Sequence, residues 1–304
     1  MKIRSQTDEG RMNMAHDTFQ AGDLTAIIGD NAAHGAHRAG YNGLWSLTHR
    51  HEAENLFVPA VAGLNFEHIF DGDKRDTDGT RKIFFEPRNA PMTFKKLSGA
   101  AAELHQPATP TFHLESWTTF ELKAPHYVDM SFRCVPTQHA FAHGYIGLFW
   151  ASYMNAPDDK SMYFFDGKLW QQLCTPAHNR DSTIRHKDDR IELKFSEGLG
   201  DALFRNLNSL RFQEPFFYGL FRNQIVIVMV DRTAGIRFTH SPSGGGVNNV
   251  RQTTNPAWDF QFIIPAFQVK AEYRFRLRLV YRDKCDRAEV LKEYAAWKKS
   301  LSQP

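Results

Sequence analysis

Residues 273–281 of this 304-residue chain read Tyr-Arg-Phe-Arg-Leu-Arg-Leu-Val-Tyr. From Tyr273 to Leu279, apolar residues occupy every second position, and arginines fill the positions between them. Successive side chains of a β-strand point to opposite faces of a sheet, so this period of two gives one apolar face and one basic face. A helix, with about 3.6 residues per turn, would mix the two kinds of residue. The segment therefore predicts a strand that is buried on one side only.

Other segments repeat this signal. Residues 128–134 and 191–195 show the same alternation, which predicts two more half-buried strands. Residues 146–150 and 225–230 are apolar throughout, a pattern typical of central strands that are covered on both faces. Turn-forming residues separate the segments at the short spacing of hairpins, without the long helical crossovers of a parallel α/β fold. We therefore predict an all-β fold, a large antiparallel β-sandwich.

One helix is predicted near the end of the sequence. Asp286 is placed to cap it, and Glu289 stands where the carboxylate of a capping box would be. Apolar residues then recur at helical spacing, namely Val290, Tyr294, Trp297 and Leu301. A sandwich of this length can form one unit. We expect residues 1–304 to form a single β-sandwich domain with a C-terminal helix at about 286–300.

The composition excludes several kinds of partner. Lys and Arg total 37 against 34 for Asp and Glu, a formal charge of +3, which gives no reason to expect a nucleic acid or a membrane surface. No apolar stretch is long enough to cross a bilayer, and the first residues lack the apolar core of a secretory signal. The three cysteines contain no CxxC pair, which fits a reducing compartment. We expect a cytoplasmic protein, and the sequence leaves its oligomeric state open.

Two segments carry groups that suit the recognition of a polar ligand. Arg88 follows an aromatic stretch, and a fixed guanidinium can donate a pair of hydrogen bonds to vicinal hydroxyls or to a carboxylate. A surface ion pair would explain it equally well. Residues 113–117 place His113 and Glu115 on one strand face and supply the indole of Trp117 for stacking.

A third segment runs through one of the apolar strands. His139 and His143 precede it, Trp150 ends it, and Tyr153 and Asn155 follow. Polar groups are expected to emerge at this end of a sheet, although packing in the core would explain the tryptophan just as well.

A fourth segment covers residues 255–261. Asp259 and Gln261 are expected on one strand face, with Trp258 and Phe260 on the other. The carboxylate is a candidate general base, and the alternative is a solvated residue on an edge strand. The sequence contains no GxxxxGK[ST], GxSxG or HExxH motif, so phosphate-loop, serine-hydrolase and zinc-peptidase activities are not indicated.

Histidines also cluster earlier in the chain. His49 and His51 would share a face if they lay on one strand, which could present two imidazoles to a metal. Glu67 and His68 follow in a short polar stretch that could form half of a polar pocket or simply satisfy backbone groups of a loop. A divalent metal near these four residues is an alternative to a site without a cofactor.

The order of these segments resembles the galactose-mutarotase-like β-supersandwich, the fold of aldose 1-epimerases, several polysaccharide lyases and glycosidase-associated domains. Residues 40–47, Gly-Tyr-Asn-Gly-Leu-Trp-Ser-Leu, are similar to the opening strand and turn of the epimerases. Residues 85–88, Phe-Glu-Pro-Arg, resemble the segment that carries the sugar-binding arginine. Residues 150–155 resemble the segment of the second epimerase histidine, but this chain has tyrosine and asparagine there and no histidine.

The resemblance implies a sugar or oligosaccharide substrate and acid–base chemistry without a cofactor. In that chemistry an acid and a base act on opposite sides of the sugar. The catalytic candidates are His113, His143 and Asp259. The substrate-binding candidates are Arg88, Glu115, Trp117, Trp150, Tyr153, Asn155 and Trp258. An epimerase of the aldose 1-epimerase type is the leading hypothesis, and the alternatives are a polysaccharide or oligosaccharide lyase, with or without a metal, and a non-catalytic carbohydrate-binding protein.

Overall fold

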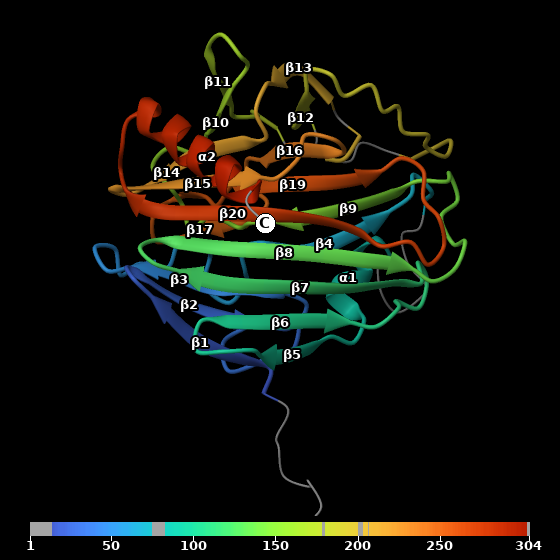
Figure 1. Cartoon of the computed structure of the whole chain (residues 1–304), viewed down its shortest axis with the longest axis horizontal. Helices are drawn as coiled ribbons and strands as arrows, with labels where there is room; N and C mark the ends of the chain where they lie inside the picture. The colour runs from blue at the N-terminus through green and yellow to red at the C-terminus, as the bar shows by residue number, and fades with distance from the viewer. Residues whose placement is uncertain (1–13, 75–82, 178–179, 200–202, 206, 303–304) are drawn as a thin grey trace, which may run out of the picture.

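The computed structural model describes residues 14–74, 83–177, 180–199, 203–205 and 207–302. Two large sheets form the body of the molecule (Figure 1). One has nine strands in the order β11-β10-β14-β15-β20-β8-β7-β6-β5. Its strands are β5 (Thr93–Lys96), β6 (Ala101–Gln106), β7 (Leu114–Lys123), β8 (Tyr127–Pro136), β10 (Met162–Phe165), β11 (Trp170–Leu173), β14 (Phe216–Phe221), β15 (Gln224–Val230) and β20 (Tyr273–Asp283).

The second large sheet has six strands in the order β13-β12-β16-β19-β9-β4. Its strands are β4 (Asn65–Phe70), β9 (Ile146–Ala151), β12 (Thr183–His186), β13 (Leu207–Phe212), β16 (Ile236–Ser241) and β19 (Ala257–Ile264). The smaller sheets join β1 (His16–Ala21), β2 (Leu24–Gly29) and β3 (Gly43–His49), and β17 (Val247–Asn248) with β18 (Thr253–Thr254). Every strand pair is antiparallel except β12 with β13. The predicted antiparallel β-sandwich is therefore confirmed.

The main core lies between the two large sheets and is rich in aromatic rings. Trp150 of β9 stacks on Phe260 of β19, with ring centroids 4.9 Å apart and an interplanar angle of 2°. From the nine-stranded sheet, Phe132 and Phe275 meet the edge of the same indole at 4.8 and 5.2 Å. The apolar faces predicted for residues 128–134 and 273–281 supply these contacts, and both predictions are confirmed.

The run of apolar residues in β15 is explained by the C-terminal helix. Val226, Val228 and Val230 face the main core. Ile225 and Ile227 face outward, where α2 (Arg287–Leu301) covers them with the buried stripe Val290, Tyr294 and Trp297. Asp286 caps this helix by accepting a hydrogen bond from the Glu289 amide at 2.8 Å, as predicted. Both faces of β15 are therefore shielded from water.

The outer face of the six-stranded sheet is covered in its turn, although not by a helix. A second apolar cluster there joins Phe149 and Ala151 of β9 with Tyr41, Trp45 and other side chains from the connecting segments. Residues 191–195, predicted as a strand, contribute here as an extended segment outside any sheet. The alternation reflects the packing of Ile191 and Leu193 on this cluster and not a hydrogen-bonded ladder, so the strand prediction was wrong.

None of the described helices combines the length and the apolar character that a membrane crossing requires.

Candidate functional site

A β-bulge in β4 aims two polar side chains at the outer face of the six-stranded sheet. Phe66 pairs with Trp150 and His68 pairs with Phe149, which leaves Glu67 as the additional residue between them. Phe66 points into the main core, where its ring lies 4.9 Å from that of Trp150. His68 contacts Phe149 of the outer cluster instead. The bulge thus breaks the strict alternation of the strand and turns two successive residues to one face.

These two side chains form a buried polar group with three others, which we call the Glu67 cluster: Tyr41, Glu67, His68, Arg88 and Tyr153. Glu67 accepts hydrogen bonds at Oε1 from Arg88, at 3.0 Å, and from the Tyr153 hydroxyl. Its Oε2 atom lies 3.1 Å from His68 Nε2. The Arg88 guanidinium also lies over the ring of Tyr41, 4.1 Å from the ring centroid. A carboxylate with three hydrogen-bonding partners is held in one orientation.

The electrostatics of the cluster favour an ionised glutamate. Burial alone would raise the pKa of Glu67, but the charges and hydrogen bonds of His68, Arg88 and Tyr153 outweigh it and hold the pKa below its ordinary value. Burial, reinforced by the negative charge of Glu67, raises the pKa of Tyr153 well above its ordinary value. At neutral pH the cluster therefore contains a carboxylate beside a protonated phenol.

Asp259 lies on the same face of the sheet, one strand beyond β9. Its carboxyl is 1 % exposed and accepts a hydrogen bond from the Ser152 amide at 3.0 Å. Burial raises the pKa of Asp259 well above its ordinary value, and the charge of Glu67 adds to this effect. The pKa values of two carboxyl groups on the same face are thus shifted in opposite directions, a pattern that can separate an acid from a base.

A hollow of about 580 Å³ opens beside the cluster on the side of Arg88. It is lined by Asn31, Ala39, Gly40, Phe85, Arg88, Asn89, Ala90 and Pro91. Arg88 both lines this hollow and contacts Glu67, so it links the space to the buried carboxylate. The volume falls within the range of about 300–1,000 Å³ that is usual for small-ligand sites.

Hydrogen bonds with three separate segments hold α1 (Glu86–Asn89), the short helix that carries Arg88. Asn31 donates to the carbonyl oxygens of Pro87 and Ala90 at 3.1 and 2.7 Å. Gln106 of β6 also donates to Pro87, at 3.0 Å. The Glu86 carboxylate accepts from the amides of residues 111 and 112. A helix of one turn is not stable in isolation, so these hydrogen bonds fix its position and the direction of the Arg88 side chain.

Three of the predicted site residues meet at this place. Arg88 and Tyr153 belong to the Glu67 cluster, and Asp259 interacts electrostatically with its carboxylate. The faces predicted for residues 258–261 are also as expected, because Asp259 and Gln261 lie opposite Trp258 and Phe260.

The two buried tryptophans belong to the core and not to the site. Trp150 is fully buried between Phe66 and Phe260. Trp258 donates its indole N–H to the Lys160 carbonyl at 2.8 Å and packs in the same core. Neither can touch a ligand on the outer face of the sheet, which corrects their assignment to substrate binding.

His113, His143 and Asn155 form their hydrogen bonds elsewhere. The His113 carbonyl accepts from the Thr137 amide, and His143 Nε2 lies 3.1 Å from the Ser196 hydroxyl. Asn155 donates to Glu54 at 3.2 Å. Within the described residues, none of these three side chains shares a hydrogen bond, ion pair or ring contact with the Glu67 cluster. The structure thus does not bring the two predicted catalytic histidines to Asp259.

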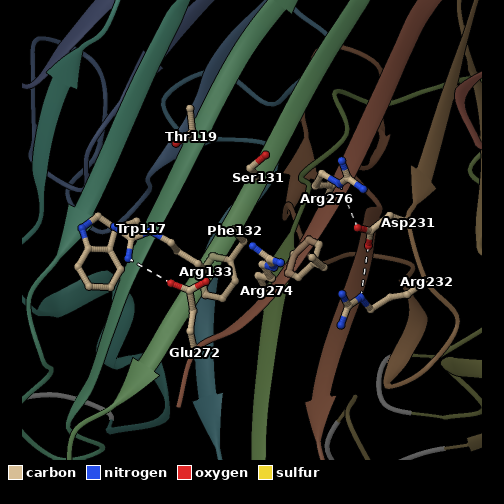
Figure 2. A pocket seen from close by; sticks show the side chains of 11 residues that line it. Trp117, Thr119, Ser131, Phe132, Arg133, Asp231, Arg232, Glu272, Arg274 and Arg276 are labelled. Atoms are coloured by element: carbon tan, nitrogen blue, oxygen red, sulfur yellow. Dashed lines mark hydrogen bonds and ion pairs between the residues drawn. The ribbon is translucent and has the colours of Figure 1, made fainter. Parts of the chain in front are cut away.

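Glu115 and Trp117 lie on the opposite side of the molecule, on the outer face of the nine-stranded sheet. Glu115 pairs with His105 at 2.8 Å. Trp117 stacks on His105, with centroids 4.9 Å apart, and on Arg133, whose guanidinium lies 3.6 Å from the ring centroid. Figure 2 shows this indole at the rim of a hollow of about 460 Å³ rich in arginines. Its neighbours on the two flanking strands stack on the ring, which is therefore only partly exposed.

The sequence signal for the Glu67 cluster was present but incomplete. For Glu67 and His68 the sequence left two interpretations open, half of a polar pocket or the satisfaction of backbone groups in a loop, and it gave no site role to Tyr41. Charged residues inside the strand-like stretch 65–70 were the available signal. The bulge that turns both side chains to one face depends on the pairing with β9, which no local pattern encodes.

The four residues of the predicted metal alternative separate into two places. Glu67 binds Arg88 and Tyr153, and His68 pairs with Glu67, whereas His51 pairs with Asp283. Among the described residues, only His49, His51 and Asp283 form a group with metal-ligand geometry. The set of His49, His51, Glu67 and His68 is therefore not one site.

No described protein family and no curated protein matches the sequence. Solved structures do match. A candidate aldose 1-epimerase from Escherichia coli K12 is 9% identical, with 88% of this chain and 99% of that chain covered and a TM-score of 0.51. A galactose mutarotase related enzyme from Lactobacillus acidophilus is 12% identical, with 89% and 98% covered and a TM-score of 0.52.

An α-N-acetylgalactosaminidase from Bifidobacterium bifidum, solved as a GalNAc complex, is 12% identical, with a TM-score of 0.54. The match covers 94% of this chain and 39% of that larger chain. At these identities the comparisons establish the fold, and this chain has the galactose-mutarotase-like β-sandwich fold that the sequence predicted.

Proposed function

We propose that this chain is a carbohydrate-active protein of the epimerase type, which interconverts the anomers of an aldose. The observation that carries the proposal is the position of Arg88, whose guanidinium lines the hollow of about 580 Å³ and binds the buried Glu67 carboxylate at 3.0 Å. The structural matches to a candidate aldose 1-epimerase and to a galactose mutarotase related enzyme support a sugar as the ligand.

The reaction needs one base and one acid. The base removes the proton of the anomeric hydroxyl while the acid protonates the ring oxygen, and the bond between the anomeric carbon and the ring oxygen breaks. Rotation of the resulting aldehyde and the reverse proton transfers close the ring with the other anomeric configuration. No oxidant, reductant or cofactor enters this balance.

We assign the base to Glu67 and the acid to Asp259. The lowered pKa of Glu67 supplies the ionised group, and burial supplies the protonated one at Asp259. This differs from the base role predicted for Asp259, because a carboxyl kept protonated by burial donates a proton instead of accepting one. Strands β4 and β19 flank β9, so the backbones that carry Glu67 and Asp259 stand about 10 Å apart on one sheet.

Entry of the sugar requires a movement. Asp259 is 1 % exposed and the Glu67 side chain 7 %. Arg88 and Tyr153 must therefore swing aside and exchange their bonds to Glu67 for bonds to sugar hydroxyls, a rearrangement of side chains that binding commonly produces. A crystal soaked with an aldose should show Arg88 on the sugar.

The experiment is to follow freshly dissolved anomers of galactose and glucose by polarimetry or NMR. The wild type should accelerate the interconversion, and Glu67→Gln and Asp259→Asn should each lower the rate about 100-fold or more, since each removes one proton-transfer group. Binding of the sugar without any acceleration would instead indicate a non-catalytic carbohydrate-binding protein. Release of unsaturated sugar from a uronic-acid polymer, seen by its absorbance, would indicate a lyase.

A further inference from the structure

A second constellation lies apart from the Glu67 cluster, at the end of the sandwich where β3 and β20 finish. His49 is the last residue of β3, and the bridge between His49 and Glu52 folds the chain back so that His51 lies at the turn. Asp283, 232 residues further along, is the last residue of β20. The fold thus brings His49 and His51, the two histidines closest in sequence, next to a carboxylate from a different sheet.

The three side chains have the separations of metal ligands. His51 Nδ1 lies 3.0 and 2.9 Å from the two carboxylate oxygens of Asp283. His49 Nδ1 lies 4.0 Å from Asp283 Oδ1, and the candidate ligand atoms all fall within 4.8 Å of one another. Bonds of about 2.1 Å in a tetrahedral site place ligand atoms about 3.4 Å apart, so the observed separations bracket that value.

The neighbours of these ligands also bear on metal binding. Asp23 Oδ2 lies 3.7 Å from the other ring nitrogen of His49, Nε2, a separation that gives the imidazole a nearby negative charge but not a hydrogen bond. The His51 amide donates to His49 Nδ1 at 3.2 Å, and a metal bound at Nδ1 would replace this bond. Gln224 donates to Asp283 Oδ1 at 2.9 Å and fixes the carboxylate. The side chains of His51 and Asp283 are 49 % and 58 % exposed, so one side of the group is open to solvent.

We propose that His49, His51 and Asp283 bind a divalent transition-metal ion of the zinc class, with water completing its coordination. Two imidazoles and one carboxylate suit this class of ion, whereas magnesium and calcium prefer oxygen ligands alone. The bound ion would tie the end of the three-stranded sheet to the end of the nine-stranded sheet. The site is independent of the proposed sugar chemistry.

The test uses the full-length chain without a histidine tag, treated with a chelator and dialysed. Titration calorimetry with zinc chloride should show one equivalent bound, and zinc should raise the temperature of thermal unfolding. His51→Ala and Asp283→Asn should each weaken zinc binding about 100-fold or more and abolish the thermal shift. Both side chains are largely exposed, and near-UV circular dichroism would check that the variants keep the fold.

His105→Ala is the matched control. His105 also pairs with a carboxylate, Glu115, at 2.8 Å and is 34 % exposed, but the described residues provide it with no third ligand. This variant should bind zinc like the wild type. Failure of the wild type to bind zinc, or equal binding by His51→Ala and Asp283→Asn, would overturn the proposal, and neither result would affect the sugar assay.

Discussion

The guanidinium of Arg88 lies 3.0 Å from the carboxylate of Glu67, although the two residues come from a one-turn helix and from an edge strand of the six-stranded sheet. The same carboxylate atom accepts the hydroxyl of Tyr153. The contacts of Glu67 with Arg88 and Tyr153 therefore have two consequences. They stabilise the packing of α1 on β4, and they favour the ionised form of Glu67 that the proposed chemistry uses.

The first prediction concerns the stability of this ion pair. Arg88→Met leaves the Glu67 carboxylate buried without its cation, and we expect the free energy of unfolding to fall by about 3 kcal/mol. Adding Glu67→Gln should recover much of that loss, because the uncompensated charge disappears. Urea unfolding of the two single variants and the double variant measures the coupling. Additive losses would mean that the pair contributes nothing beyond its separate side chains.

The second prediction concerns pH. Asp259 has a raised pKa in the folded protein, so its contribution to stability is fully present below the ordinary Asp pKa and is lost as the pH rises toward the folded value. Each pH unit in that window costs about 1.4 kcal/mol. Asp259→Asn should remove this dependence, so the variant should gain stability relative to the wild type as the pH rises above about 4. Parallel pH profiles of the two proteins would contradict the assignment.

Glu67 shifts in the opposite direction and is therefore separable from Asp259. Its pKa is lowered in the fold, so its contribution is present above the ordinary Glu pKa and is lost as the pH falls through the folded value. Acid unfolding of Glu67→Gln should accordingly show a weaker pH dependence below about pH 4.3 than that of the wild type.

The third prediction tests the corrected catalytic assignment. His113→Ala and His143→Ala should keep the mutarotation rate within about twofold, since the hydrogen bonds of these residues lie away from Glu67 and Asp259. Tyr153→Phe should lower the rate about 10-fold or more, because it removes the hydroxyl that is proposed to leave Glu67 and bind the sugar. The anomer assay measures all three variants under one condition. A large loss in either histidine variant would restore the original hypothesis.

The sequence predicted the secondary structure correctly where the spacing of apolar residues, or a capping residue, determines it locally. The strand around Phe275, the capped helix at Asp286 and the separation of Asp259 from Trp258 all follow from side-chain periodicity and capping chemistry. The alternation around Leu193 shows the limit, because packing on one side produces the same period without a sheet.

The site was less predictable because it depends on pairing between distant segments. Glu67 and His68 share a face only through the bulge against β9. The tryptophans Trp117 and Trp150 both suited sugar stacking by residue type, yet one is covered by cross-strand neighbours and the other is buried in the core. Residue type and spacing cannot distinguish these environments.

The fourth prediction uses that contrast. Trp150→Ala should lower the free energy of unfolding by about 3–5 kcal/mol, because it opens a cavity among the stacked rings of Phe66 and Phe260. Trp117→Ala, at the surface, should cost about 1 kcal/mol, chiefly the contact with Arg133. Urea unfolding compares the two. Similar losses would mean that Trp117 is part of the cooperative core.

The fifth prediction distinguishes the effect of contact with Arg88 in the hollow from the effect of backbone strain at a glycine. Gly40 has a φ of +89°, and a methyl group added there would lie 3.3 Å from Arg88 Nε. Gly35 has a φ of +56°, but the same methyl group would meet nothing within 4 Å. Gly35→Ala should therefore carry only the backbone cost of about 1 kcal/mol, whereas Gly40→Ala should also shift the Arg88 side chain by a few tenths of an ångström. If Arg88 orients the sugar, Gly40→Ala should raise the KM for the aldose several-fold while Gly35→Ala leaves it unchanged. Both glycines have a positive φ, but only Gly40 contacts the Arg88 side chain. Equal effects of the two variants on KM would therefore mean that Arg88 does not orient the substrate.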